Sequence, residues 1–363
     1  MGRKPGAACP RSGRALALKP QMARNFSDAL FASRASSLVL SPLARWGYWR
    51  FLRTGSTPHA GYVAMRRLYG AHPAGFERLV RRARRDHAMV ELDELSTGLM
   101  SGVVDESLDA LRRDGIYVVP KRLDAASCDE LEALALGTDC TLIGEHVVEG
   151  SRARFDPDSP MAPRYELAES ELLALPAVQG LLADVSLIAV AQGYLGSAPA
   201  QDMVAMWWSA ALSGDPSSVA AQKFHFDLDR LRFLKFFVYL TDVGADSGPH
   251  TYVRGTHRNL AAGFRRDRRC EDMDVERTYA ANITTVLGER GTVFLADTRG
   301  LHKGVAPARG HRLVFQIEYA TSLFGQTVNY ADLGHEVIPE LRHAIDRYPT
   351  VFERFSGVAG GVR

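Results

Sequence analysis

Short apolar runs separated by turn residues follow one another from residue 202 to about residue 322. In order they are MVAMWWSAAL, KFHFD, RFLKFFVYL, HTYV, ITTVL, GTVFLA and HRLVFQIEYA. No long helical pattern separates them, and short strands in close succession are typical of an antiparallel sandwich or barrel. The pattern therefore predicts an α+β protein with a mostly β core and helices packed outside it.

Helical spacing dominates the chain before residue 202, where apolar residues recur every three to four positions. Helices are predicted over residues 73–95, 125–136 and 169–196, the last with a break near Pro176. Ser127 and Glu130 have the spacing of a capping box at the start of the second helix. GIYVVP, at residues 115–120, predicts a short strand.

Two segments show no sustained period. Residues 1 to about 55 contain scattered Ser, Gly and Pro, so we expect a loosely ordered extension there. Residues 259–281 form a long and highly charged connection. Connections of this length usually belong to functional lids or mobile segments, and the sequence leaves open whether this one is a lid.

Charge is distributed unevenly along the 363 residues. Residues 1–90 contain 17 Lys and Arg against 3 Asp and Glu, a net charge of +14, and the remainder contains 27 against 39, a net charge of −12. A basic region can bind nucleic acid or an anionic membrane, but basic and aromatic residues do not interleave here in a binding signature. We therefore favour a helical face that docks on the chain's own acidic part, and we expect no nucleic-acid partner.

The four cysteines lie far apart without a CxxC pair, which indicates neither a zinc site nor a disulfide framework. Reduced thiols in a cytosol explain them most simply. No apolar run approaches the roughly 18 residues of a membrane span, and the basic start lacks the apolar core of a secretory signal. We expect a cytoplasmic protein without a membrane span, and the sequence does not indicate its oligomeric state.

The stretch KFHFDLDR places one histidine and two carboxylates at alternate positions. Side chains at positions i and i+2 of a strand leave the same face, so His225 and Asp227 would point together into the space that the sheet encloses. With His302, which follows the predicted strand GTVFLA, they form the two-histidine, one-carboxylate set that binds Fe(II) and leaves positions open. A lone histidine is more often a packing residue, so the prediction depends on the conjunction.

Asp229 shares this strand face, which makes the choice of carboxylate ligand a question of reach. Two residues span about 6 to 7 Å along a strand, so Asp229 would lie about twice as far from His225 as Asp227 does. Asp227 is therefore the predicted ligand. We expect Asp229 to pair with Arg230 or Arg232 at the entrance, although a contact with substrate stays open.

Arg312 stands ten residues beyond His302, at the start of the next predicted strand. A guanidinium binds a carboxylate through two parallel hydrogen bonds, which suits the far end of a dicarboxylate cosubstrate such as 2-oxoglutarate. The alternative is an ordinary surface ion pair, for which Glu318 on the same strand face is available.

Further polar and aromatic residues are weaker candidates for contact with substrate. Gln316 faces either the interior or solvent, and Lys235 either adds a second charge for the cosubstrate or, as we prefer, is an exposed edge lysine. Gln222, Trp207 and Trp208 line the pocket mouth unless they belong to the core. The histidines that we place outside the site are His257 and His311.

The chain from about Gly115 to Gly325 resembles the phytanoyl-CoA dioxygenase family of Fe(II)- and 2-oxoglutarate-dependent oxygenases. The stretches FHFDLDRLRFLKFFVYLTDVGADSGPHTYVRGTHR, GTVFLADTRGLHKG and HRLVFQIEY carry the resemblance, and GIYVVPKRLDAASCDELEAL is similar to the family's opening strand and helix. The departures from the family pattern are Phe224, His250, Arg254 and Thr256.

The resemblance implies a double-stranded β-helix of the jelly-roll or cupin-like type. It implies His225, Asp227 and His302 as iron ligands and Arg312 as the anchor of 2-oxoglutarate. The open metal positions would take the cosubstrate and O₂, and a small-molecule substrate would be hydroxylated with release of succinate and CO₂. The carboxylate ligand favours hydroxylation, since related halogenases lack it.

Two alternatives stay open: a non-catalytic β-helix binding module, and a cupin-like Fe(II) enzyme that does not use 2-oxoglutarate. In domain terms we expect three regions. They are a basic, partly disordered and helical extension over residues 1–105, the oxygenase domain over 106–325, and a C-terminal helix with a flexible tail over 326–363.

Overall fold

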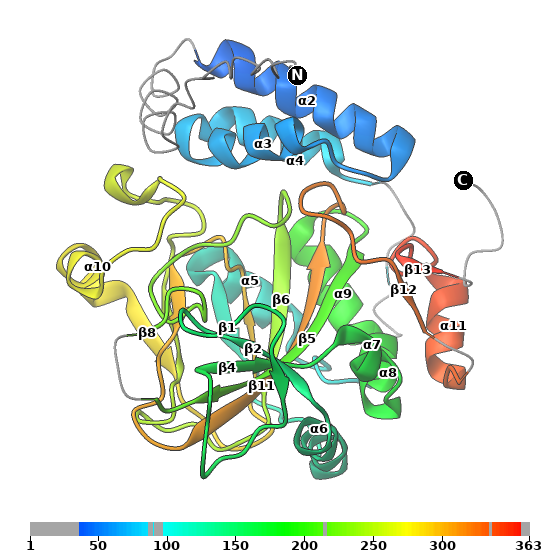
Figure 1. The fold of residues 1–363 in the computed structure, drawn as a ribbon. Coiled ribbons are helices and arrows are strands. Elements are labelled where there is room, and N and C mark those ends of the chain that lie inside the picture. Colours follow the sequence, from blue (N-terminus) through cyan, green and yellow to red (C-terminus); the bar gives the residue numbers. More distant parts are fainter. Residues whose placement is uncertain (1–35, 86–89, 91–96, 213–215, 334–335, 357–363) are drawn as a thin grey trace, which may run out of the picture.

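The computed structural model describes residues 36–85, 90, 97–212, 216–333 and 336–356. A layer of helices lies at one end of a β core, and further helices cover the sides of that core (Figure 1). The expectations for residues 1–35, for most of residues 86–96 and for the tail 357–363 lie outside the described residues.

The β core is built from two antiparallel sheets. The main sheet has the order β1 (Ile116–Val118), β9 (Val293–Ala296), β6 (Phe233–Tyr239), β11 (His311–Ala320), β5 (Ala200–Ala210), β4 (Arg164–Glu166), β2 (Cys140–Ile143) and β3 (Arg152–Ala153). The small sheet has the order β10 (His302–Gly304), β7 (His250–Val253) and β8 (Ile283–Val286). From β6 to β11 the chain passes repeatedly between the sheets, as in a jelly roll, which confirms the predicted fold class.

The side chains of β6 alternate between the two faces of the main sheet, and both faces are buried. Leu234 and Phe236 pack into the cluster formed with the outer helices, whereas Phe237 and Tyr239 belong to a second cluster between the sheets. Full burial of each such side chain stabilises the fold by about 1.5–3 kcal/mol. Every residue of β6 is buried, so it reads as a continuous apolar run interrupted only by Lys235.

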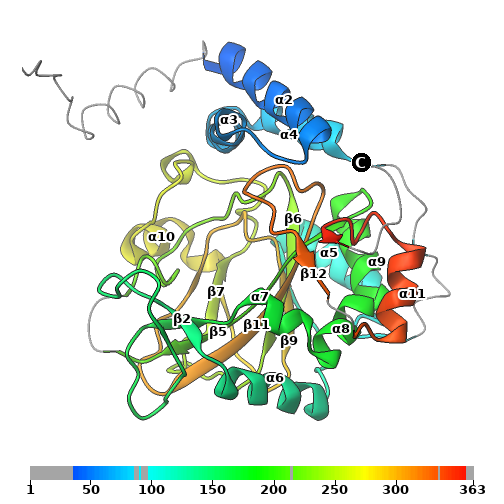
Figure 2. The ribbon, with the colours of Figure 1, turned by 45° about the vertical axis from the view of Figure 1, so that its right-hand side comes forward.

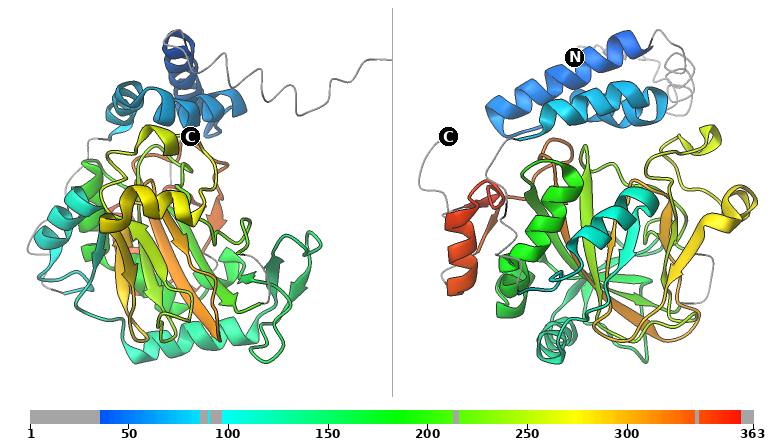
Figure 3. Two further views of the ribbon diagram at one scale, coloured as in Figure 1. Left: turned by 90° about the vertical axis from the view of Figure 1, so that its left-hand side faces the viewer. Right: turned by 180° about the vertical axis from the view of Figure 1, so that it is seen from behind.

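Helices cover the outer face of the main sheet, with α5 and α9 behind it and α6 along its far end (Figures 2 and 3). The covering helices are α5 (Val104–Asp114), α6 (Ala125–Gly137), α7 (Glu169–Leu173), α8 (Pro176–Ala183), α9 (Val185–Leu195) and α11 (Pro339–Arg347). The break near Pro176 is confirmed, and a second break occurs at Asp184, whose carboxylate caps α9 by accepting from the Ser186 N–H. A short parallel pair, β12 (Ala331–Asp332) and β13 (Phe355–Ser356), lies near the C-terminal end.

The predicted capping box of α6 is wrong. Asp124 is the N-cap residue, and its carboxylate accepts from the Ser127 N–H at 2.9 Å. Ser127 therefore occupies the third position of the helix rather than its cap, and its hydroxyl donates to the same aspartate. The sequence signal for the true N-cap was Asp124, which directly precedes the helix. The capping-box spacing that begins at Ser127 drew attention away from it.

The N-terminal layer consists of α2 (Ser36–Thr54), α3 (His59–Ala71) and α4 (Pro73–Ala83). The expected loose extension is therefore wrong for residues 36–54. A buried inner face that includes Leu40, Ala44 and Tyr48 stabilises α2, and Gly47 and Gly61 allow α2 and α3 to approach so closely that a Cβ on either would clash. The helix predicted over 73–95 ends at Ala83, because the next residue is extended.

The helical layer docks on the β core partly through apolar contacts. Tyr48 packs edge-on against Phe324, Tyr69 packs against Phe226, and one exposed ion pair joins Arg66 to Asp267. These helices therefore pack on the chain's own body mainly through buried aromatic rings. The expected docking through an Arg-rich face is wrong for α2, because Arg45, Arg50 and Arg53 stay exposed.

Residues 259–281 contain a 3₁₀ turn, η2 (Ala262–Phe264), and a helix, α10 (Asp272–Tyr279), followed by η3 (Ala280–Asn282). Phe264, Cys270 and Val275 are buried in a cluster beneath this segment. It is therefore not an irregular loop, and its role as a lid stays a prediction.

Within the described residues no single helix has the length and apolar character needed to cross a membrane. Together α8 and α9 pass that test as a pair bent by 48°. Most of their apolar side chains are buried in the main core, so they serve as core helices.

Candidate metal centre

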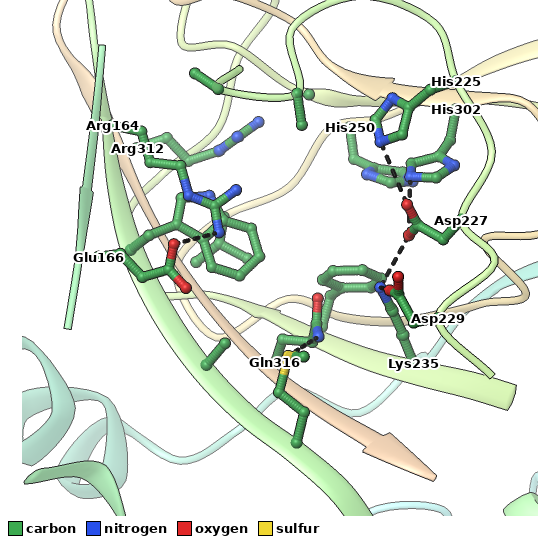
Figure 4. Close-up of a pocket in the computed structure, with 18 of the residues that line it drawn as sticks. Arg164, Glu166, His225, Asp227, Asp229, Lys235, His250, His302, Arg312 and Gln316 are labelled. Carbon is green, nitrogen blue, oxygen red and sulfur yellow. Dashed lines mark hydrogen bonds and ion pairs between the residues drawn. The ribbon is translucent and has the colours of Figure 1, made fainter. Parts of the chain in front are cut away.

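A cavity of about 300 Å³ lies between the two sheets (Figure 4). His225, Asp227 and His302 gather at one side of it, Arg312 lies at the opposite side, and Asp229, Lys235 and Gln316 line the space below them in this view. Aromatic side chains of the main sheet, including Phe237 and Phe294, separate the polar groups. The cavity therefore brings together all four residues that the sequence singled out.

The segment KFHFD is not a regular strand, so that expectation is wrong. His225 forms only an isolated bridge with His302, in which each backbone N–H donates to the other's carbonyl oxygen at 2.9 and 2.8 Å. The Asp227 N–H donates in the same way to Thr298 O at 2.8 Å. These bonds align the segment with the chain leading into β10 and place the two imidazole centroids 4.3 Å apart.

The three side chains form the one group among the described residues whose ligand atoms suit a shared metal ion. All three ligand atoms lie within 4.8 Å of one another. Nε2 of His225 is 3.5 Å from Oδ1 of Asp227, and Nε2 of His302 is 3.6 Å from Oδ2. These separations suit atoms that each lie about 2.0–2.2 Å from one ion. The arrangement is compatible with an iron site of the two-histidine, one-carboxylate kind.

Both histidines are held in the tautomer that a metal needs. Nδ1 of His225 donates to Lys223 O at 2.9 Å, and Nδ1 of His302 donates to Gly300 O at 3.0 Å, so both Nε2 lone pairs are free for the metal. The pKa of His225 is lowered to about 3, mainly by burial and secondly by the neighbouring His302. Burial also lowers the pKa of His302. Both rings are therefore neutral at pH 7.

Asp227 is ionised although burial opposes its charge. The ammonium of Lys235 is the largest influence against that burial, and the pKa of Asp227 lies well below its usual value. Lys235 Nζ donates to Oδ2 of Asp227 at 2.9 Å. The predicted ligand carboxylate thus has a fixed cationic partner.

The preferred reading of Lys235 as an exposed edge lysine is wrong. Its side chain is only 8% exposed, because β6 lies between β9 and β11 in the middle of the main sheet. Glu318 stands opposite Lys235 on β11, 3.4 Å from its Nζ. Burial raises the pKa of Glu318 well above its usual value, and the nearby Lys235 opposes that rise.

Asp229 lies in the cavity wall but outside the metal-ligand group, and it does not form the predicted pairs. Arg230 binds Asp202 through two bonds of 2.7 Å, and the Arg232 guanidinium lies over the ring of Tyr194. Asp229 instead approaches Lys235 at 4.0 Å. Burial and then the charge of Asp227 raise its pKa.

Arg312 is 4% exposed, and only part of its hydrogen-bonding capacity is used. Nη2 donates to Ser209 Oγ at 3.1 Å, whereas Nε and Nη1 are buried without a hydrogen-bond partner among the described residues. The alternative pairing with Glu318 does not occur, since Glu318 faces Lys235. Burial lowers the pKa of Arg312 to about 10, which still leaves a buried cation at neutral pH. An anion in the cavity would satisfy it.

The remaining candidates divide between the cavity and the core. Trp207 and Gln316 line the cavity, whereas Gln222 does not, because its side chain accepts from the Ser217 N–H. Trp208 and His311 pack together on the opposite face of the sheet. His257 is buried away from the cavity lining.

Sequence reasoning missed two basic residues of the cavity. His250 lines it with its ring centroid 5.5 Å from that of His302, and its Nε2 is buried without a partner in the described part of the chain. Arg164 lies over the ring of Trp207 at 4.2 Å and pairs with Glu166 at 3.2 Å. His250 was visible only as a departure from the family pattern, and no strand was predicted at Arg164.

No family model and no curated protein matches the chain. Solved structures with a similar fold include the non-heme alpha-ketoglutarate-dependent epimerase SnoN from nogalamycin biosynthesis, with 19% identity over 66% of this chain and 89% of that chain and a TM-score of 0.45. EctD from S. alaskensis, solved with bound Fe, has 19% identity over 66% and 85% and a TM-score of 0.45. HygX from Streptomyces hygroscopicus, solved with nickel, 2-oxoglutarate and hygromycin B, has 18% identity over 65% and 93% and a TM-score of 0.43. At these values the likeness extends to the general architecture and to nothing finer.

Proposed function

We propose that the protein is an Fe(II)- and 2-oxoglutarate-dependent oxygenase that hydroxylates a small molecule and releases succinate and CO₂. The observation that carries the proposal is that two complementary binding groups lie at opposite sides of one cavity. A His225, Asp227 and His302 group faces a buried Arg312 whose Nε and Nη1 have no partner among the described residues. The residue pattern from about 115 to 325 supports membership of the phytanoyl-CoA dioxygenase family.

The donor set fits the proposed metal. Two neutral imidazoles and one carboxylate on one side of a cavity are the ligands that non-haem Fe(II) oxygenases use, with the opposite positions left open. Bound Fe(II) would supply the O₂-activating redox chemistry that these side chains lack. Gly300 and Lys223 orient the imidazoles through their carbonyl oxygens, and Lys235 orients the carboxylate.

The cavity also fits the proposed cosubstrate. A dicarboxylate that reaches from the metal group to Arg312 would give Nε and Nη1 the acceptors that they lack. The part of the cavity between the metal group and Arg312 is lined by His250 and by the apolar side chains of Phe237, Phe294 and Val314. These walls exclude water and so strengthen the interaction of Arg312 with a carboxylate.

The proposal is tested by anaerobic calorimetry with Fe(II) and 2-oxoglutarate, followed by measurement of succinate when O₂ is admitted. We expect one Fe(II) per chain, metal-dependent binding of 2-oxoglutarate, and slow succinate formation even without the substrate. The matched control is His257→Asn, which alters a buried histidine outside the cavity lining.

Three outcomes would contradict the proposal. Absence of Fe(II) binding would favour a non-catalytic binding module. Fe(II) binding without 2-oxoglutarate binding would favour a cupin-like enzyme of another type. Incorporation of halide instead of hydroxyl would exclude a hydroxylase.

A further inference from the structure

Helix α2 is apolar on two opposite faces. Its inner face, with Leu40, Ala44 and Tyr48, is buried against the rest of the helical layer and Phe324. Its outer face also presents large apolar side chains, which are between 46% and 78% exposed. They are Leu38, Val39, Trp46, Trp49 and Leu52. A helix with apolar side chains on two opposite faces is normally covered on both, and no described residue covers the outer side of α2.

The exposed apolar side chains of α2 stand among arginines. Arg45, Arg50 and Arg53 of α2 are exposed on the same side, and the Arg53 guanidinium lies over the Trp49 ring at 4.3 Å. The sequence of α2 contains no Asp or Glu. Arg82 of α4 joins Arg45, Trp46 and Trp49 in lining a shallow groove between the two helices. We call Leu38, Val39, Arg45, Trp46, Trp49, Arg50, Leu52 and Arg53 the outer α2 face.

The concentration of apolar groups on this face is not repeated elsewhere in the described chain. The other exposed large apolar residues come singly from separate strands, helices and loops. They are Val118, Leu136, Val148, Met161, Leu212, Val219, Met273, Leu287 and Tyr330. Scattered residues of that kind are normal, whereas a contiguous group rimmed by charge marks an interaction site.

The arginines and apolar side chains of the outer α2 face favour one class of partner over another. A symmetric contact with a second copy would oppose Arg45, Arg50 and Arg53 with the same three arginines, which would repel one another. A bilayer with anionic headgroups has no such conflict, because arginines pair with lipid phosphates while tryptophan and leucine enter the boundary between headgroups and acyl chains.

We propose that the outer α2 face binds the surface of an anionic lipid bilayer and holds the protein there as a peripheral attachment. The face lies on the outermost helix of the layer (Figure 3), and the inner side of α2 is fixed to α3 at the close approach of Gly47 and Gly61. The attachment concerns the helical layer alone and does not depend on the reaction carried out in the cavity.

The full chain is tested with vesicles of phosphatidylcholine alone and of phosphatidylcholine mixed with phosphatidylglycerol. We expect co-sedimentation with the mixed vesicles only, and release by high salt. Tryptophan emission gives a second readout, because Trp46 and Trp49 are exposed whereas the other two tryptophans, Trp207 and Trp208, are buried. A blue shift on binding therefore reports the outer α2 face.

Variants separate the contributions of apolar and charged groups. Trp49→Ser with Leu52→Ser should abolish vesicle binding, whereas the control Val148→Ser with Met161→Ser, which changes two exposed apolar residues of the β body, should not. Arg45→Gln and Arg53→Gln should each weaken binding roughly fivefold. Unchanged far-ultraviolet circular dichroism establishes that each variant is folded, since all these positions are exposed.

Two results would overturn the proposal. One is failure of the wild-type chain to bind the mixed vesicles, or binding that the Trp49 and Leu52 substitutions leave intact. The other is a lipid-free dimer, detected by light scattering, that the same substitutions dissociate. That dimer would make a second copy of the chain the partner of the outer α2 face.

Discussion

Lys235, in the middle of the main sheet, places its Nζ 2.9 Å from Oδ2 of Asp227, and its side chain is buried. The bond joins a buried cation to the only carboxylate of the metal-ligand group in the described chain. Without Lys235, the negative charge of Asp227 would face burial with only neutral imidazoles beside it. The lysine therefore holds this carboxylate both ionised and oriented toward the two imidazoles.

Lys235→Met removes that partner while keeping an unbranched apolar side chain in place. We expect the affinity for Fe(II) to fall by about 10- to 100-fold, as is usual when the group that orients a metal ligand is lost. Anaerobic titration with Fe(II) or Co(II) measures the change, and Lys121→Met on the surface is the control. Unchanged affinity in a folded Lys235→Met protein would show that Asp227 needs no cationic partner.

Asp227→Ala and Asp229→Asn distinguish the two carboxylates of KFHFDLDR. We expect the first to abolish stoichiometric Fe(II) binding, because two imidazoles alone would remain in the group. The second should retain the metal, since Asp229 lies outside the group and approaches Lys235 only at 4.0 Å. Metal analysis of the purified variants decides the matter, and the reverse result would make Asp229 the ligand.

Arg312→Met should weaken the binding of 2-oxoglutarate without affecting Fe(II). Loss of one partner from a buried, hydrogen-bonded charge pair costs about 2–5 kcal/mol, so we expect at least a roughly 30-fold rise in the dissociation constant. Calorimetry on the Fe(II)-loaded protein measures it. Arg164→Met, which removes the neighbouring guanidinium that already pairs with Glu166, serves as the comparison. Equal losses in both variants would contradict a specific role for Arg312.

The metal-free protein should lose stability as the pH falls below about 6.5. Burial lowers the pKa of His257 to about 4 and that of His225 to about 3, so between those values and 6.5 the unfolded chain binds protons that the folded chain does not. Each imidazole changes the free energy of unfolding by up to about 1.4 kcal/mol per pH unit. Its contribution to stability is complete above pH 6.5 and is lost as the pH falls toward the pKa of the folded state.

Urea unfolding of chelator-treated protein between pH 7 and pH 4 measures this slope. His257→Phe should reduce this slope, because it removes one imidazole whose pKa burial lowers. A free energy of unfolding that does not depend on pH over this range would mean that the buried imidazoles are protonated in the folded state.

The strands and the metal-ligand group were predictable because their signals are local. Short apolar runs bounded by turn residues mark β6, β7, β9 and β11 within a few positions each. The short spacing from His225 to Asp227 limits which carboxylate reaches a shared ion. Even where KFHFD is not a regular strand, the backbone bonds between His225 and His302 keep this geometry. His302 and Arg312 were predicted as site residues because each stands near the start of a strand of the same core, His302 as the first residue of β10 and Arg312 as the second of β11.

The environment of Lys235 was not predictable, because a strand's neighbours are set by pairing between distant segments. Only the order β9, β6, β11 shows that Lys235 lies in a central strand opposite Glu318. The same holds for Arg164, which β4 brings to the cavity from outside the predicted strands.

By itself, the sequence determined the β core, the candidate ligands and the basic character of the first quarter of the chain, since these follow from local pattern and residue type. The tertiary structure alone decided which charges are buried together and which apolar side of α2 stays uncovered. Burial and electrostatic partners arise from the packing of segments far apart in the chain, and no local period records them.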